Sequence, residues 1–172
     1  MRVVGGSARG RRLHAPKGTD VRPTSDRTRE SIFNVLMSLG GVEGGTVVDL
    51  FAGTGGLGIE ALSRGAEHAT FVDRDVDLVR ANLDAVGLAD RATVVKADVL
   101  RWLEGAPAFD IAFADPPYAF DDWAVLLGRL RADLVVVESD RPIDPGDRWR
   151  VLRTKQYGST VVVVAQPNVS DS

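Results

Sequence analysis

The chain of 172 residues contains no cysteine and only two histidines, His14 and His68. Without thiols it can form no disulfide and no thiolate zinc site, and it has no cysteine nucleophile. The two histidines lie far apart in the sequence, which argues against a histidine-rich metal site. We therefore expect a protein that works without a metal.

Long apolar runs are also missing. The longest span only a few residues, as at 161–165, whereas a membrane-spanning helix needs about 20. The N-terminus lacks the apolar core of a signal peptide. With 44% hydrophobic and 26% charged residues, the composition is that of an ordinary globular protein. We expect a cytoplasmic monomer with one compact domain.

Charge is spread unevenly along the chain. The first 29 residues hold eight basic and two acidic side chains, a net charge of +6, although the whole chain carries −3. Two short extended stretches at 2–6 and 11–15, joined by a turn, predict a small β-hairpin. We expect a basic arm over residues 1–20 and a second region over 21–172. The arm is either an ordinary solvated terminus or a surface for phosphates.

The pattern from residue 24 onward predicts a Rossmann-like α/β fold. A helix begins at Thr24 or Ser25 and ends at Gly40. Apolar strands and amphipathic helices then alternate, as in a doubly wound parallel sheet. The strands are expected at 47–51, 69–72, 92–96, 109–114 and 134–137, and the helices at 58–64, 76–86, 99–103 and 123–130. Two last strands, 149–157 and 159–166, are separated only by Gly158 and must pair antiparallel.

A glycine-rich stretch follows the first strand. Residues 53–58 match G-x-G-x-x-G between a strand and a helix, where this motif binds the phosphates or sugar of a nucleoside cofactor. Asp49 lies within the first strand, Asp73 ends the second, and Asp98 follows the third. Carboxylates at this edge can accept hydrogen bonds from ribose hydroxyls and an adenine amine. Each alone could instead be a helix cap or a solvated charge.

The fourth strand leads into Asp115-Pro116-Pro117-Tyr118. Two prolines fix φ and remove two backbone donors, so the segment forms a rigid bend. It presents a carboxylate, carbonyl oxygens and an aromatic ring at one place. Because parallel strands end at one edge of the sheet, Asp115 is expected beside the glycine-rich stretch.

Two nucleoside cofactors fit these features, a nicotinamide dinucleotide and S-adenosylmethionine. Asp98, the Asp115–Tyr118 segment and the final hairpin make the chain resemble the class I S-adenosylmethionine-dependent methyltransferases. The resemblance implies seven strands, with the last inserted antiparallel between the fifth and sixth. It also implies methylation of a nucleobase amine by Asp115, Pro116, Pro117 and Tyr118. Cofactor contacts are implied at Asp49, Phe51, Gly53, Thr54, Gly55, Gly58, Asp73, Arg74, Asp98 and Val99.

The N-terminal third carries a closer resemblance. Val3-Val4-Gly5-Gly6, Gly10-Arg11-Arg12-Leu13, Arg22-Pro23-Thr24-Ser25-Asp26-Arg27 and Tyr157-Gly158-Ser159-Thr160 resemble the RsmD family of bacterial ribosomal RNA guanine-N2 methyltransferases. This resemblance implies a 16S RNA substrate in a small subunit or an assembly intermediate. It implies RNA contacts at Arg2, Arg9, Arg11, Arg12, Arg22, Thr24 and Arg27. We expect the arm to bind RNA while cofactor binding stays independent of it.

Three other functions remain open. An amine methyltransferase acting on DNA or transfer RNA would share the core chemistry. An NAD-dependent oxidoreductase would need a proton donor for hydride transfer, and no histidine or lysine is well placed for that role. A non-catalytic RNA-binding module would leave the glycine-rich stretch and Asp115 unexplained. Methylation at pyrimidine C5 is disfavoured because it normally uses a cysteine nucleophile.

Overall fold

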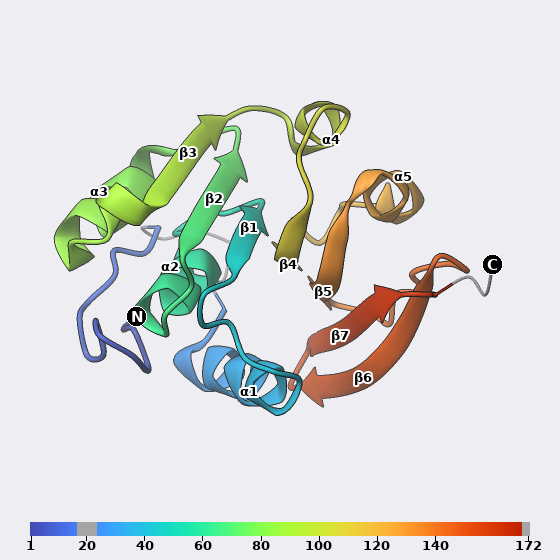
Figure 1. Ribbon diagram of the computed structural model, residues 1–172, viewed down its shortest axis with the longest axis horizontal. Coiled ribbons are helices and arrows are strands. Elements are labelled where there is room, and N and C mark those ends of the chain that lie inside the picture. Colours follow the sequence, from blue (N-terminus) through green and yellow to red (C-terminus); the bar gives the residue numbers. More distant parts are fainter. Residues whose placement is uncertain (17–23, 170–172) are drawn as a thin grey trace.

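A computed structural model describes residues 1–16 and 24–169 (Figure 1). Its centre is a seven-stranded sheet with the order β3-β2-β1-β4-β5-β7-β6. The strands are β1 (Thr46–Leu50), β2 (His68–Asp73), β3 (Ala92–Lys96), β4 (Phe109–Ala114), β5 (Ala132–Ser139), β6 (Trp149–Tyr157) and β7 (Thr160–Pro167). The predicted α/β fold is confirmed.

The sheet is mixed, as the sequence indicates. β1 to β5 are parallel to their neighbours, whereas β7 lies antiparallel between β5 and β6. The tight connection at Gly158, which has a φ of +60°, permits the antiparallel hairpin. The expectation that the last strand inserts between the fifth and sixth is therefore confirmed.

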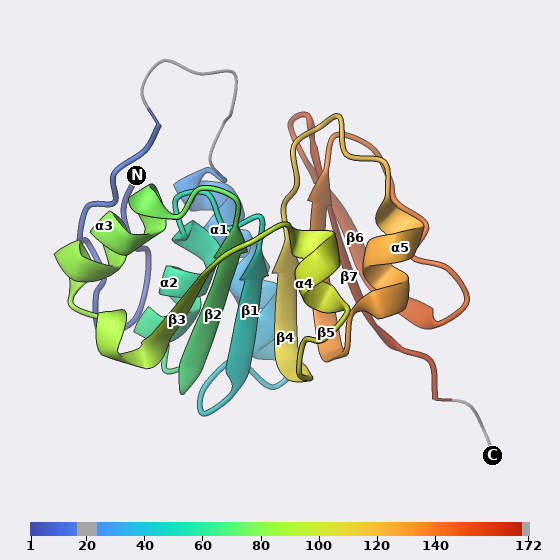
Figure 2. The same ribbon diagram turned by 90° about the horizontal axis from the view of Figure 1, so that it is seen from above.

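Helices cover both faces of the sheet. Figure 1 shows α1 and α2 on one side of it and α4 and α5 on the other, and Figure 2 gives the same layers from above. The elements are α1 (Asp26–Ser38), α2 (Gly56–Ser63), α3 (Asp77–Val86), α4 (Val99–Leu103) and α5 (Trp123–Arg129), with a 3-10 turn, η1 (Ala89–Arg91). α2 begins inside the glycine motif, earlier than predicted, because the N–H of Ile59 already donates to the carbonyl of Gly55 at 2.9 Å.

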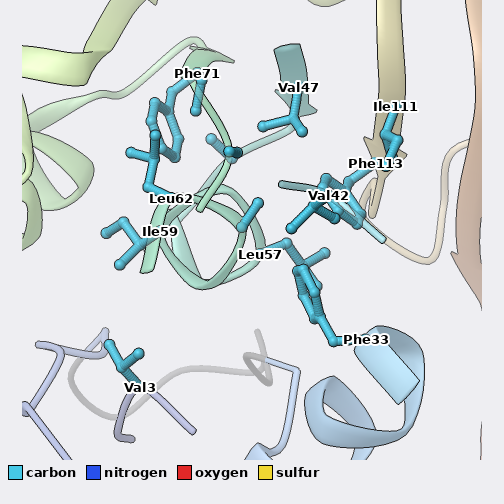
Figure 3. Close-up of a cluster of buried hydrophobic side chains, with 14 of the residues drawn as sticks. Val3, Phe33, Val42, Val47, Leu57, Ile59, Leu62, Phe71, Ile111 and Phe113 are labelled. Atoms are coloured by element: carbon cyan, nitrogen blue, oxygen red, sulfur yellow. The ribbon is translucent and has the colours of Figure 1, made fainter. Parts of the chain in front are cut away.

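The continuous apolar strands feed two cores. Successive strand side chains point to opposite faces, so Val47 packs on the α1–α3 side and Val48 on the α4–α5 side. Figure 3 shows the first of these cores, where Phe33 of α1 and Phe113 of β4 have ring centroids 5.7 Å apart. Both faces need apolar residues, which explains why the strands do not alternate with polar positions.

The N-terminal segment is packed against the body. Residues 1–16 turn back on themselves where a small β-hairpin was predicted, and an isolated antiparallel bridge joins Arg2 and Arg12. Val3, Ala8 and Leu13 are buried in the first core, and Val3 lies beside α2 in Figure 3. Burial of these apolar side chains stabilises a segment that would be marginal alone.

Within 1–16 and 24–169, no helix has both the length and the hydropathy to cross a bilayer.

Candidate functional site

The strand order reverses between β1 and β4, and ligands of open α/β sheets bind at such a topological switch point. β2 lies on one side of β1 and β4 on the other. Asp49, Asp115 and Glu138 each follow, two residues later, a side chain of the first core: Val47, Phe113 and Val136. By strand alternation the three carboxyl groups therefore share the α1 face near the carboxyl edge of the sheet.

A first cavity lies over the glycine-rich loop. Its lining includes the expected Asp49, Phe51, Gly53 and Thr54, and also Asp115. Gly53 has a φ of +57°, and a side chain built there would face open space, with the carbonyl of Phe51 as its nearest neighbour at 3.9 Å. The backbone at Gly53 thus borders the cavity in a conformation that glycine adopts freely.

Asp49 joins the strand to the following helix. Its Oδ2 accepts a hydrogen bond from the N–H of Gly58 at 2.9 Å. Burial raises the pKa of Asp49 well above its ordinary value, against the opposing effect of that N–H. Gly58 itself is needed for packing, because an added Cβ would lie 2.3 Å from Cε1 of Phe71.

Phe51 has an unusual backbone. Its φ is +58°, the only positive value found for a non-glycine residue in the described part of the chain. Such strain persists only where the surroundings hold it. Here the Phe51 ring contacts Phe120 edge-on with centroids 5.1 Å apart, and Phe120 contacts Trp123 at the same separation.

The predicted ribose and adenine residues lie at the ends of β2 and β3. Asp73 accepts from the N–H of Gly53 at 2.8 Å, so it directly orients the glycine-rich loop. Asp98 caps α4 by accepting from the N–H of Arg101, and it pairs with Arg74 at 2.8 Å. Hydrogen bonding from Arg74 lowers the pKa of Asp98. Val99 is buried in the second core. The described residues that line the first cavity do not include Asp73, Arg74, Asp98 or Val99.

A second cavity adjoins the first at Asp115 and Thr24, which line both. Tyr118 also lines it and is half exposed, while Pro116 is buried and Pro117 is exposed. The carbonyl of Pro117 accepts from the N–H of Phe120 at 2.9 Å, which closes the bend. The far wall is formed by the β6–β7 connection from Tyr157 to Thr160.

Glu138 of β5 completes this cavity and was not among the predicted site residues. The register pairs Ala114 with Val137, so Asp115 and Glu138 follow on neighbouring strands. The hydroxyl of Thr24 lies 2.8 Å from Glu138 Oε2 and 3.3 Å from Asp115 Oδ2. The sequence did offer a signal for Glu138, because it lies among the apolar residues of β5 and unpaired charges are almost never fully buried. A carboxylate at such a position indicates a partner or a ligand.

The Asp115–Glu138 pair is held in an environment that favours protonation. Burial raises the pKa of both carboxyl groups, and the nearby Asp115 charge raises that of Glu138 further. Among the described residues, Glu138 Oε1 has no hydrogen-bond partner although the side chain is buried. A hydrogen bond between the two carboxyl groups also raises the pKa of Glu138 and lowers that of Asp115, so a protonated Glu138 can donate to Asp115. The single hydroxyl proton on Thr24 cannot serve both carboxylates at once.

The predicted RNA residues do not all lie on the surface. Arg2, Arg9, Arg11, Arg12 and Arg27 are exposed, Thr24 lies inside the site, and Arg22 falls outside the described residues. Another basic residue of this region, Arg29, is fully buried and pairs with Glu60 of α2 at 3.0 Å. One of the positive charges near the N-terminus is therefore structural.

The N-terminal segment also reaches the first cavity. Met1 and Pro16 are part of its lining. Glu60 accepts from the backbone N–H groups of Val4 and Gly5 at 2.8 and 2.9 Å. Asn82 of α3 accepts from the N–H of His14 at 2.7 Å. The N-terminal segment is therefore part of the wall of the first cavity, and the expected independence of cofactor binding from this segment stays a prediction.

Comparison with known proteins gives a consistent result. Residues 1–166 match the family model described as Conserved hypothetical protein 95. YlbH of Bacillus subtilis is 41% identical over 95% of this chain and 97% of its own length. Ribosomal RNA small subunit methyltransferase D of Haemophilus influenzae is 32% identical over 92% of this chain and 89% of its own.

Solved structures agree with this grouping. The structure of yhhF from Escherichia coli is 31% identical, covers 99% of both chains and has a TM-score of 0.85. The chain therefore belongs to the family of Conserved hypothetical protein 95, the RsmD family of ribosomal RNA methyltransferases.

Proposed function

We propose that this protein transfers a methyl group from S-adenosylmethionine to the N2 amine of one guanine in 16S ribosomal RNA of a small subunit or its assembly intermediate. The observation that carries the proposal is the position of Asp115, which lines both cavities. A group bound over the glycine-rich loop and a base bound beside Tyr118 would then meet at one carboxylate. The name of the Haemophilus influenzae relative supports ribosomal RNA as the substrate class.

The first cavity fits an adenosine-containing cofactor. Gly53 lets a ligand approach the backbone, and Asp73 uses only part of its accepting capacity on the N–H groups of Gly53 and Arg74. When bound, S-adenosylmethionine supplies an electrophilic methyl group on a sulfonium. The residues that would hold it are Asp49, Phe51, Gly53, Thr54, Gly55, Gly58, Asp73, Arg74, Asp98 and Val99.

The chain's own residues would prepare the amine. The lone pair of an exocyclic amine is delocalised into the base, and acceptors on its two N–H bonds help to localise it on nitrogen. Asp115 would accept from one N–H and the carbonyl of Pro116 from the other, while Tyr118 stacks on the base. The fixed carboxylate also stabilises the positive charge that develops on nitrogen. The rigid double proline holds these groups in place, and positioning is a large source of rate acceleration.

The base must leave its stack to enter the second cavity. The exposed arginines of the N-terminal segment, Arg2, Arg9, Arg11 and Arg12, would hold the surrounding phosphates. Arg27 at the start of α1 is a fifth exposed arginine of this N-terminal group. We propose that the protein acts as a monomer on this substrate.

The test compares Asp115→Asn with Asp121→Asn, a matched change at a side chain that is 91% exposed. Asp115→Asn should lower turnover on small-subunit particles by about 100-fold, because a preorganised charge at the reacting atom is lost. Calorimetry with S-adenosylhomocysteine should show cofactor affinity within a few fold of wild type. Mass spectrometry of the digested RNA should detect N2-methylguanosine with wild type and Asp121→Asn. Undiminished turnover of Asp115→Asn would contradict the proposed role.

A further inference from the structure

We propose that Glu138 recognises the target base as guanine by accepting its N1–H, next to the N2 amine held by Asp115. This inference rests on the proposed function and deepens it by assigning the choice of base to one residue. Glu138 lines the second cavity, is 3% exposed and has an oxygen, Oε1, without a hydrogen-bond partner in the described structure. A buried acceptor left unpaired is costly, so a donor from a ligand is the natural complement.

The spacing of the two carboxylates suits adjacent donors. Asp115 and Glu138 follow paired residues of β4 and β5 and both lie within hydrogen-bonding distance of the Thr24 hydroxyl. Asp115 Oδ2 and Glu138 Oε2 can therefore be no farther apart than the sum of those two short distances, and the unpaired Oε1 belongs to the same carboxyl group as Oε2. The N1–H and N2 amine of guanine occupy neighbouring positions on one edge of the base. Two neighbouring carboxylates can thus accept from both nitrogens at once.

The same pair discriminates among the bases that have an exocyclic amine. In guanine the ring nitrogen beside the amine carries a hydrogen and is a donor. In adenine and cytosine the corresponding ring nitrogen has a lone pair and is an acceptor. Burial favours the protonated form of Glu138 in the free protein, and the N1–H of guanine stabilises the ionised form that accepts from it. The lone pair of adenine or cytosine gives the ionised carboxylate no such donor, so binding of either base with its amine at Asp115 would be disfavoured.

The experiment uses small-subunit particles reconstituted with RNA that carries either guanine or 2-aminopurine at the target position. 2-Aminopurine keeps the amine but has an acceptor at N1. Wild-type protein should prefer guanine by at least about 100-fold, as expected for a site that hydrogen-bonds its substrate. In Glu138→Gln an amide can donate to N1 of 2-aminopurine, so the preference should fall by about tenfold or more.

Two controls accompany this experiment. Glu104→Gln, on an exposed side chain, should keep the wild-type preference. Calorimetry with S-adenosylhomocysteine should give the same affinity for wild type and Glu138→Gln, because Glu138 does not line the described part of the first cavity. An unchanged preference in Glu138→Gln, with N2-methylguanosine formed by wild type, would overturn the recognition role alone. Absence of N2-methylguanosine from the wild-type reaction would overturn the proposed function, and this inference with it.

Discussion

Replacing Glu60 by glutamine should both destabilise the protein and weaken ligand binding at the proposed cofactor site. The Glu60 carboxylate is fully buried and accepts four hydrogen bonds. Oε1 accepts from Val4 N–H and Arg29 Nε, and Oε2 accepts from Gly5 N–H and Arg64 Nε, all at 2.8–3.0 Å. These bonds fill the lone-pair sites of a carboxylate. The residue therefore ties the N-terminal segment to α1 and α2.

The magnitude follows from what glutamine cannot do. Whichever way its amide turns, one backbone N–H and one arginine nitrogen lose their acceptor. Removing one partner of a buried ion pair costs about 3–5 kcal/mol. The low end applies here, about 3 kcal/mol, because Asp26 still lies 2.9 Å from Arg29 and keeps part of its charge compensated. For a chain of this size that loss lowers the melting temperature by about 6–12 °C.

Urea denaturation with a matched surface variant tests this reasoning. Glu104→Gln removes an exposed pair with Arg129, 3.5 Å apart, and should cost at most about 1 kcal/mol. Glu60→Gln should also bind S-adenosylhomocysteine more weakly, because Val4 and Gly5 hold the segment that places Met1 on the first cavity. A loss below about 1 kcal/mol with unchanged affinity would refute the proposed coupling of segment and cavity.

Two further predictions concern packing and pH. Gly58→Ala places a Cβ 2.3 Å from Phe71 and should lower the free energy of unfolding by about 1–3 kcal/mol, measured by thermal denaturation. The control Gly128→Ala, whose Cβ would have no described atom within 4 Å, should lose no stability, and equal stabilities of the two variants would contradict the prediction. Because burial raises the pKa of Glu138 in the folded protein and the charges of Asp115 and Asp49 raise it further, the native state binds more protons than the unfolded chain above pH about 4. Stability should then fall as pH rises through that window, and Glu138→Gln should be more stable than wild type at pH 8 by an amount that shrinks toward pH 4. A constant difference across this range, measured by denaturation, would exclude Glu138 as the titrating group.

Much of the fold could be predicted because the parallel strands are continuous apolar runs bounded by polar residues. The expected bounds of β3, β4, β6 and α4 agree with the structure. The antiparallel pairing of β6 and β7 was predicted from Gly158, since a single glycine leaves no room for a crossover helix. The position of β7 between β5 and β6 was implied by the family resemblance. The start of α2 was less predictable, because glycines that indicate a loop also form its first turn.

The site was predicted in part for the same reason. Asp49 lies near the end of β1, Asp73 ends β2 and Asp115 follows β4, and the sheet brings these strand ends together. Glu60 was missed because a glutamate in a short helix usually indicates a solvated face, and only the tertiary fold shows that Arg29 and the N-terminal backbone meet there. The left-handed backbone of Phe51 could not be predicted from the sequence, where its ring contact with Phe120 is not visible.

The distribution of charge favours phosphate binding on the surface and base binding in the second cavity. Asp49, Asp115 and Glu138 lie on one face near the carboxyl edge, and no described residue lining the second cavity is basic. Such a cavity repels phosphates and favours neutral N–H donors, because a bound donor supplies the stabilisation that the buried carboxylates lack. The exposed arginines of residues 1–16 lie on a segment that also lines the first cavity. RNA phosphates would therefore be held outside, and only an extruded base with donors at both nitrogens would satisfy the carboxyl pair within.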